Sequence, residues 1–102
     1  MKNTYQELTL ENGETVKLTL NFAKLLKIKN DQPKTYDRFM KVLQNKDFDI
    51  MFDSLTVLYT GYLCANVNNE SILSEDEFME LVPFDLETIN VVAGQLIQSK
   101  KK

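Results

Sequence analysis

The feature that most constrains the fold is a change of hydrophobic period at Asn21. Before it, apolar residues alternate with polar ones on both sides of Asn12-Gly13. These apolar residues are Leu8, Leu10, Val16, Leu18 and Leu20. Such alternation is typical of half-buried strands, and Asn-Gly favours a two-residue type I′ turn because both residues tolerate a positive φ. The sequence therefore predicts a β-hairpin over about residues 5–20, whose apolar face must lie against helices or pair with another chain.

From Asn21 onward, apolar residues recur at the three- and four-residue spacing of amphipathic helices. Asn21 is a suitable N-cap for the first helix, which is expected to end at the turn-forming stretch 30–33. One side of this helix carries Phe22, Leu25, Leu26 and Lys29. One side of the second helix carries Tyr36, Phe39, Met40 and Leu43.

The third predicted helix is the longest, begins at the N-cap Asp47, and bears a continuous apolar stripe. Its members are Phe48, Met51, Phe52, Leu55, Leu58, Tyr59, Tyr62 and Leu63. A helix with so long a stripe is expected to be the central helix of the core. The turn-rich stretch 66–69 should end it.

Two short capping signals predict the last two helices. Ser74 and Glu77 form a capping box before Phe78, and Asp85 follows Pro83 as the next cap. The apolar positions expected in these helices are Met79, Leu81, Leu86, Ile89, Ala93, Leu96 and Ile97. The predicted fold is therefore α+β and mostly α-helical. It is one domain over 1–102, with the hairpin at about 5–20 and about five helices over 21–99 packed in a small bundle.

Two glycines fall inside the predicted helices. Gly61 and Gly94 each cost a helix about 1 kcal/mol relative to alanine. Close packing of a neighbouring element is therefore expected at both positions.

The residues needed for catalysis are missing. The chain has no histidine, which removes the usual general base near neutral pH and the commonest transition-metal ligand. Cys64, the one cysteine, lies near the end of an apolar stripe and is expected to be a packing residue. The three glycines are isolated and form no phosphate-binding loop. The sequence predicts neither an enzyme nor a cofactor site.

Acidic residues offer a weak case for metal binding. Asp49 and Asp53 share a helix face, as a carboxylate pair for a hard cation would. The stretch 66–71, however, lacks the acidic first residue and the sixth-position glycine of an EF-hand loop. The acids at the predicted helix starts are explained by the helix dipole alone. No metal site is predicted.

Charge is sorted into blocks along the chain. Residues 17–46 contain eight bases and two acids, whereas residues 47–87 contain ten acids and no base. Such segregation orients partners, or copies of the same chain, through a long-range field, although it also fits two differently solvated faces. We expect self-association of opposed blocks. The candidate interaction residues are Lys24, Lys27, Lys34, Arg38, Lys41, Glu75, Asp76, Glu77 and Glu80.

The basic block also raises nucleic-acid binding, with Tyr36 beside the lysines. The chain has a single arginine, whereas base recognition depends on bidentate guanidinium contacts. A sequence pI near 4.9 opposes phosphate binding as well. The composition therefore disfavours nucleic acid as a partner.

Nothing in the sequence predicts export or a membrane span. The first residues lead into no apolar region of a signal peptide. Apolar stretches are broken by Asp53 and Gly61 before they approach the roughly 18 residues of a span. A single cysteine fits a reducing compartment, so a cytoplasmic location is expected.

Two stretches, Glu11–Phe22 and Leu81–Ile89, carry a resemblance to a known family. With them come a Tyr-rich end to the central helix and an acidic Ser-x-x-Glu-Phe helix start at Ser74. From end to end, the chain resembles the tail assembly chaperones of long-tailed phages and prophages of Gram-positive bacteria. None of these features is a catalytic signature.

The resemblance implies a protein outside the virion that acts in the bacterial cytoplasm. It would bind the tape measure protein and help tail-tube subunits polymerise around it. Adaptable contacts would come from the hairpin edge and from methionines and tyrosines, unless these side chains pack in the core. They are Tyr36, Met40, Met51, Tyr59, Tyr62 and Met79. The alternative is another phage interaction module, such as a regulator or an acidic nucleic-acid mimic.

Overall fold

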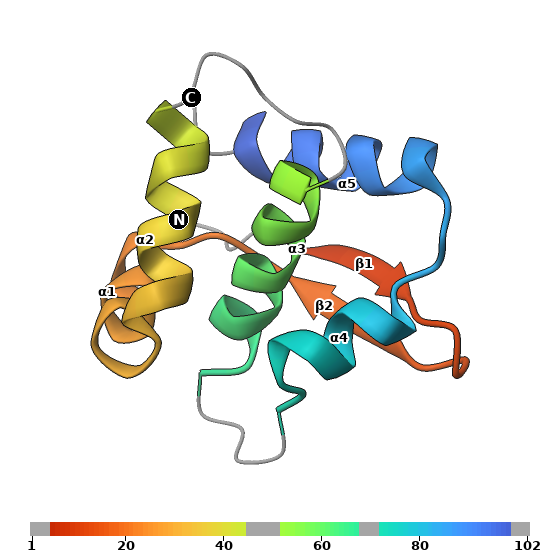
Figure 1. The fold of residues 1–102 in the computed structure, drawn as a ribbon, viewed down its shortest axis with the longest axis horizontal. Helices are drawn as coiled ribbons and strands as arrows, with labels where there is room; N and C mark the ends of the chain where they lie inside the picture. Colours follow the sequence, from red (N-terminus) through yellow and green to blue (C-terminus); the bar gives the residue numbers. More distant parts are fainter. Residues whose placement is uncertain (1–4, 45–51, 68–71, 99–102) are drawn as a thin grey trace.

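The computed structural model describes residues 5–44, 52–67 and 72–98, and it contains a two-stranded hairpin followed by five helices (Figure 1). The strands are β1 (Gln6–Thr9) and β2 (Thr15–Leu18). The helices are α1 (Phe22–Asp31), α2 (Pro33–Gln44), α3 (Phe52–Ala65), α4 (Glu75–Leu81) and α5 (Leu86–Gln98). The predicted α+β, mostly helical fold is confirmed.

The hairpin turn differs from the predicted one. The last strand pair is Thr9 with Thr15, and the Gly13 N–H donates to the Leu10 carbonyl at 2.9 Å. Gly13 has a φ of +89°, but no other described residue has a positive φ, Asn12 included. A type I′ turn needs two positive φ values, so that prediction was wrong. The geometry is that of a three-residue loop in which glycine alone takes the left-handed conformation.

The apolar face of the hairpin lies against helices. This was one of the two predicted alternatives, the other being pairing with another chain. Leu8, Leu10, Leu18 and Leu20 are all buried. β2 packs against α3, and β1 packs against α5. The hairpin therefore completes the helical core.

α3 is the central helix, as predicted. It packs against α1, α2, α4, α5 and β2, and Figure 1 shows it in the middle of the molecule. Its buried residues lie on all sides, as expected of a helix with no solvent-facing side. They include Val57, Leu58, Tyr59, Tyr62, Leu63 and Cys64. The predicted cap Asp47, the stripe residues Phe48 and Met51, and the side chain of Phe52 lie outside the described residues, as do loop residues 68–69.

Gly61 marks the closest approach between α3 and the hairpin. A Cβ atom at this position would lie 3.3 Å from Leu18 Cβ and 3.2 Å from Leu96 Cδ1. The Gly61 carbonyl also accepts a hydrogen bond from the Thr19 N–H at 3.1 Å. The predicted close packing is confirmed here. It was wrong for Gly94, where a Cβ atom would meet nothing within 4 Å.

The side of α1 predicted from its apolar pattern is only partly the side that is buried. Ile28 is the buried residue of α1, whereas Phe22 is 79% exposed and Leu26 is 59% exposed. α1 packs against both α2 and α3, and Leu25, one of the predicted residues, packs half-buried against the core that contains Ile28. On α2, Phe39 is buried as predicted but Leu43 is half-exposed.

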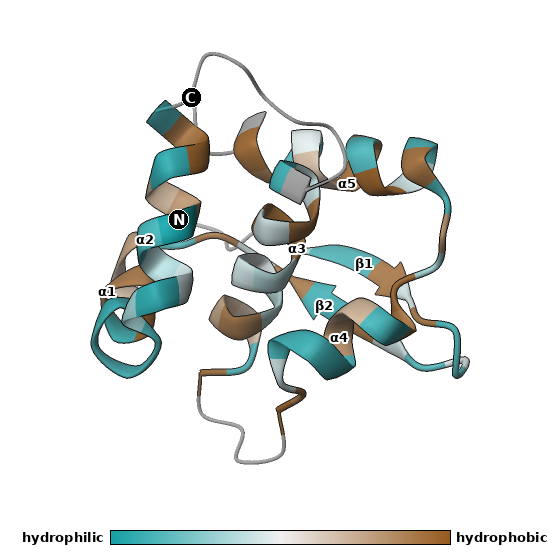
Figure 2. Cartoon of the chain, viewed as in Figure 1, coloured by the Kyte–Doolittle hydropathy of each residue, from teal (hydrophilic) through white to brown (hydrophobic). Residues whose placement is uncertain are grey.

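The predicted caps Asn21, Ser74 and Asp85 are confirmed. The Asn21 side chain accepts from the Ala23 and Lys24 N–H groups, and Ser74 and Glu77 form the full capping box. Asp85 accepts from the Thr88 N–H at 3.2 Å and from the Thr88 hydroxyl at 2.8 Å. These bonds from Thr88 hold the pKa of the Asp85 carboxyl below its usual value. Figure 2 shows the hydrophilic first turn of α4 beside α3, in which hydrophobic residues alternate with residues of intermediate hydropathy.

Candidate functional site

An apolar groove lies on the outer side of α1 and α2. It comprises two adjoining hollows of about 290 Å³ and about 220 Å³, which share Phe22, Leu25, Phe39 and Leu43. The other lining residues are Leu20, Asn21, Leu26, Tyr36, Met40 and Ile97. We call this surface the α1–α2 groove.

The groove exists because α1 has apolar residues on more than one side. Gln32 alone separates the two helices, so they pack against each other, and Ile28 takes the core position. The side chains left over, Phe22 and Leu26, face solvent next to Leu43 of α2. Lys29 lies over the ring of Tyr36, with its Nζ 5.8 Å from the ring centre. Exposed apolar patches of this kind mark interaction surfaces.

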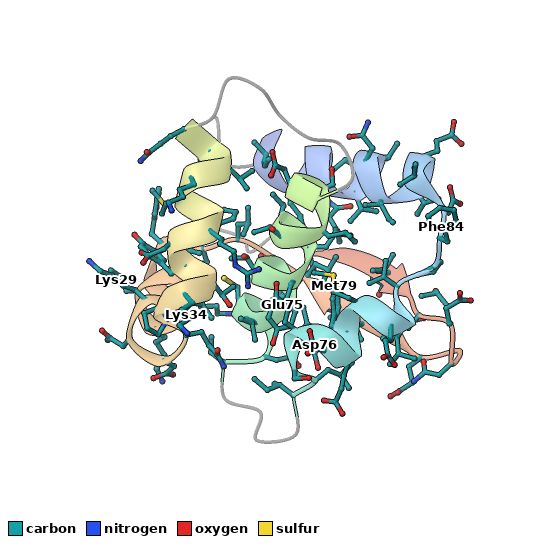
Figure 3. All side chains as sticks on the ribbon, in the orientation of Figure 1. Lys29, Lys34, Glu75, Asp76, Met79 and Phe84 are labelled. Atoms are coloured by element: carbon teal, nitrogen blue, oxygen red, sulfur yellow. The ribbon has the colours of Figure 1, made fainter. Side chains whose placement is uncertain are left out.

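A second groove, between α2, α3 and α4, carries charge of both signs. It holds about 550 Å³, and its lining includes Arg38, Lys41, Asp53, Leu55, Glu75 and Met79. Arg38 forms an ion pair with Glu75. Glu75 belongs to α4 and is labelled near the middle of the molecule in Figure 3. We call this surface the charged groove. In it the basic and acidic blocks of one chain meet.

The predicted interaction residues do not form one site. Arg38, Lys41 and Glu75 line the charged groove, whereas Lys24, Lys27 and Lys34 line neither groove. The Glu77 side chain is held in the capping box. Asp76 and Glu80 are exposed on α4.

The tyrosines considered as partner contacts include two that belong to the core. Tyr59 and Tyr62 are both buried, and their rings pack against the ring of Phe78 at centroid distances of 5.3 Å and 5.0 Å. Burial, with a smaller contribution from Glu75, raises the pKa of Tyr59 to about 12. Tyr36, Met40 and Met79 are half-buried, and Met51 lies outside the described residues. The core alternative therefore holds for Tyr59 and Tyr62.

The acidic side chains that the structure describes do not gather as metal ligands do. Within residues 5–44, 52–67 and 72–98, no three histidine, cysteine, aspartate or glutamate side chains are placed to hold one ion. Asp49, the predicted neighbour of Asp53, lies outside these ranges. In the same ranges, no helix is long and apolar enough to cross a bilayer.

The exposed apolar side chains that were missed from the sequence include Phe22, Leu26, Leu43 and Phe84. A signal for the first two was available, because α1 has five apolar residues in ten and one side of a surface helix needs fewer. Phe84 follows a proline outside any helical pattern, where solvent exposure has no sequence signal. Its exposed fraction is 84%.

Comparison of the chain with protein-family models, with curated proteins and with solved structures gives no match.

Proposed function

We propose that this protein is a tail assembly chaperone of a long-tailed phage, acting in the host cytoplasm without catalysis. Its client would be the tape measure protein, which it would keep available for tail-tube polymerisation. The proposal rests on the end-to-end resemblance together with one structural observation. That observation is the α1–α2 groove, which leaves large apolar side chains exposed on a folded domain.

The groove has the properties of a site for an amphipathic helix. The two helices that form it are 10 and 12 residues long, which corresponds to about 15–18 Å at 1.5 Å per residue. An amphipathic helix fills such a groove with side chains at i, i+3 or i+4, and i+7. Full burial of an exposed phenylalanine or leucine contributes about 1.5–3 kcal/mol, so Phe22, Leu26 and Leu43 together supply a useful driving force.

This chemistry suits a long helical client. Apolar stripes exposed at micromolar concentration associate with one another unless a partner covers them. Half-buried Met40 lies in the groove, and its flexible thioether side chain can adapt to different apolar surfaces. One such groove could therefore bind successive segments of a client with a similar pattern.

The test is co-expression with the tape measure protein of the same operon. The client should precipitate alone and stay soluble with this protein. Leu26→Asp should abolish that protection, because it places a charge where the apolar helix would lie. Leu26 is 59% exposed, so the fold should survive. Val91→Asp on α5, at a position 50% exposed, is the matched control and should protect as the wild type does.

Three results would reject the proposal. The first is a client that stays insoluble with the folded wild-type protein. The second is equal protection by Leu26→Asp, and the third is loss of protection in the Val91→Asp control. Protection that depends instead on exposed acids of α4, such as Asp76 and Glu80, would favour the alternative of an acidic interaction module.

A further inference from the structure

Phe84 is an exposed aromatic side chain on a hydrogen-bonded turn between α4 and α5. The Asp85 N–H donates to the Pro83 carbonyl at 2.8 Å, and Asp85 in turn caps α5 through Thr88. On the other side, Val82 is buried and its N–H donates to the Phe78 carbonyl. The turn is therefore anchored at both ends while Phe84 remains 84% exposed. The backbone that carries Phe84 therefore loses little conformational freedom on binding.

The charges around Phe84 and around the α1–α2 groove are opposite. α1 and α2 carry six bases and two acids, a net charge of +4. Residues 75–87 carry six acids and no base, a net charge of −6. Among the residues that the structure describes, Arg38–Glu75 is the only ion pair between these two segments. Most of the opposite charge is thus available to a second molecule.

The α1–α2 groove accepts an aromatic side chain better than the charged groove does. Its larger hollow holds about 290 Å³, and no acidic residue lines it. The charged groove is lined by Asp53 and Glu75, which would repel the acids on either side of Phe84.

From these observations we propose that the Phe84 turn of one copy docks into the α1–α2 groove of a second copy. Figure 3 shows Phe84 at one end of the molecule and Lys29 and Lys34 at the opposite end, so one chain does not fill its own groove. The contact is heterologous, because each copy offers a different surface to each neighbour. Such contacts continue into rings or open helical filaments. Under the proposed function, the same groove also holds the client. The client and the neighbouring copy would then compete for it.

The test is a pair of variants that each lack one half of the contact. Phe84→Ser removes the docking side chain and Leu26→Asp blocks the groove. Each should stay monomeric in sedimentation velocity at concentrations where the wild type forms larger species. Loss of a central aromatic anchor should weaken association by about 30-fold or more. Mixed one to one, the variants should form a 1:1 heterodimer and grow no further, because only one intact contact remains.

The control is Val91→Ser, which should associate as the wild type does. The inference is overturned by a wild type that is monomeric throughout, by a Phe84→Ser variant that associates normally, or by a mixture that forms no heterodimer. The co-expression assay with the client distinguishes a failure of the self-association inference from a failure of the proposed function. Phe84→Ser should still protect the client, since its groove is intact, whereas a chain that self-associates normally without protecting any client would refute only the chaperone role.

Discussion

The backbone of Leu73 is hydrogen-bonded to two tyrosines of α3: one binds its carbonyl and the other binds its N–H. The Tyr59 hydroxyl donates to the Leu73 carbonyl at 3.0 Å, and the Leu73 N–H donates to the Tyr62 hydroxyl at 2.8 Å. Leu73 directly precedes Ser74, the cap of α4. These two bonds therefore fix where α4 begins, and with it the position of the acidic residues on that helix.

Tyr59→Phe should destabilise the protein by about 1–3 kcal/mol, because the Leu73 carbonyl loses its partner. Tyr5→Phe, at an exposed position, is the control and should stay within about 0.5 kcal/mol of the wild type. Urea unfolding followed by far-UV circular dichroism measures both. A Tyr59→Phe variant as stable as the control would show that this hydrogen bond contributes nothing.

The same tyrosine predicts a loss of stability at alkaline pH. The pKa of Tyr59 is raised from 10.0 to about 12, so the folded state favours the neutral phenol. The resulting stabilisation is complete below pH 10 and is lost as the pH rises from 10 towards 12, because the unfolded chain ionises first. The urea midpoint of the wild type should therefore fall more steeply above pH 10 than that of Tyr59→Phe. Parallel curves for the two proteins would contradict the assignment.

At the residue scale, sequence reasoning identified the caps but not the groove. Asn21, Ser74 and Asp85 cap through hydrogen bonds to residues two or three positions away, and such bonds depend on local sequence alone. Whether Ile28 or Leu26 is buried depends on how α1 packs against α2 and α3, which its own periodicity does not specify.

Among the elements, α3 and β2 approach each other most closely at Gly61. Leu18 Cβ is fixed to the strand backbone, whereas Leu96 Cδ1 is the end of a movable side chain. An added methyl group at Gly61 would therefore be resisted mainly by the hairpin. The Thr19–Gly61 hydrogen bond would be strained by any separation of the two elements.

Gly61→Ala and Gly94→Ala should have opposite effects on stability. Both gain about 1 kcal/mol in helix propensity. At Gly61, overpacking costs about 1–3 kcal/mol and should outweigh that gain, whereas the space beside Gly94 is open. Chemical denaturation should show a net loss for the first variant and a gain of about 0.5–1 kcal/mol for the second. Equal stabilisation of both would mean that the hairpin shifts freely away from α3.

At the element scale, the order and type of the helices and strands were predictable because each has its own hydrophobic periodicity, bounded by turn-forming or capping residues. The hairpin turn type was not. Asn12-Gly13 is compatible with two loop lengths, and the pairing of Thr9 with Thr15 selects the longer one. That pairing follows from burying Leu8 and Leu18 against the helices, which is a tertiary constraint.

For the whole molecule, the important property is the separation of charge between its ends. The basic α1–α2 pair lies on one side of α3, and the α4–α5 turn lies on the other (Figure 1). Arg38–Glu75 is the point where the two blocks touch within one chain. The remaining separation gives the molecule a dipole that can orient a second copy before contact.

Reversing exposed acids near the Phe84 turn should weaken self-association. Glu80→Lys with Glu87→Lys should raise the dissociation constant at least about 10-fold at low salt. Glu7→Lys with Glu14→Lys makes the same change in net charge on the hairpin without altering Glu11, which contacts Leu81 close to the turn, and should have little effect. The difference should shrink near 1 M salt, where the Debye length is about 3 Å. Sedimentation velocity across a salt series measures it, and equal effects of the two pairs would reduce the role of charge to net charge alone.

The contacts of the hairpin also determine when the chain can complete its fold during synthesis. β1 and β2 are translated before the helices, yet their apolar face is covered by α3 and α5, and Leu96 lies close to Gly61 and Leu18. A hairpin alone is marginally stable in water. The two strands therefore gain all their partners only after α5 has been translated. A nascent chain arrested before α5 should expose the leucines of the hairpin and be a substrate for host chaperones.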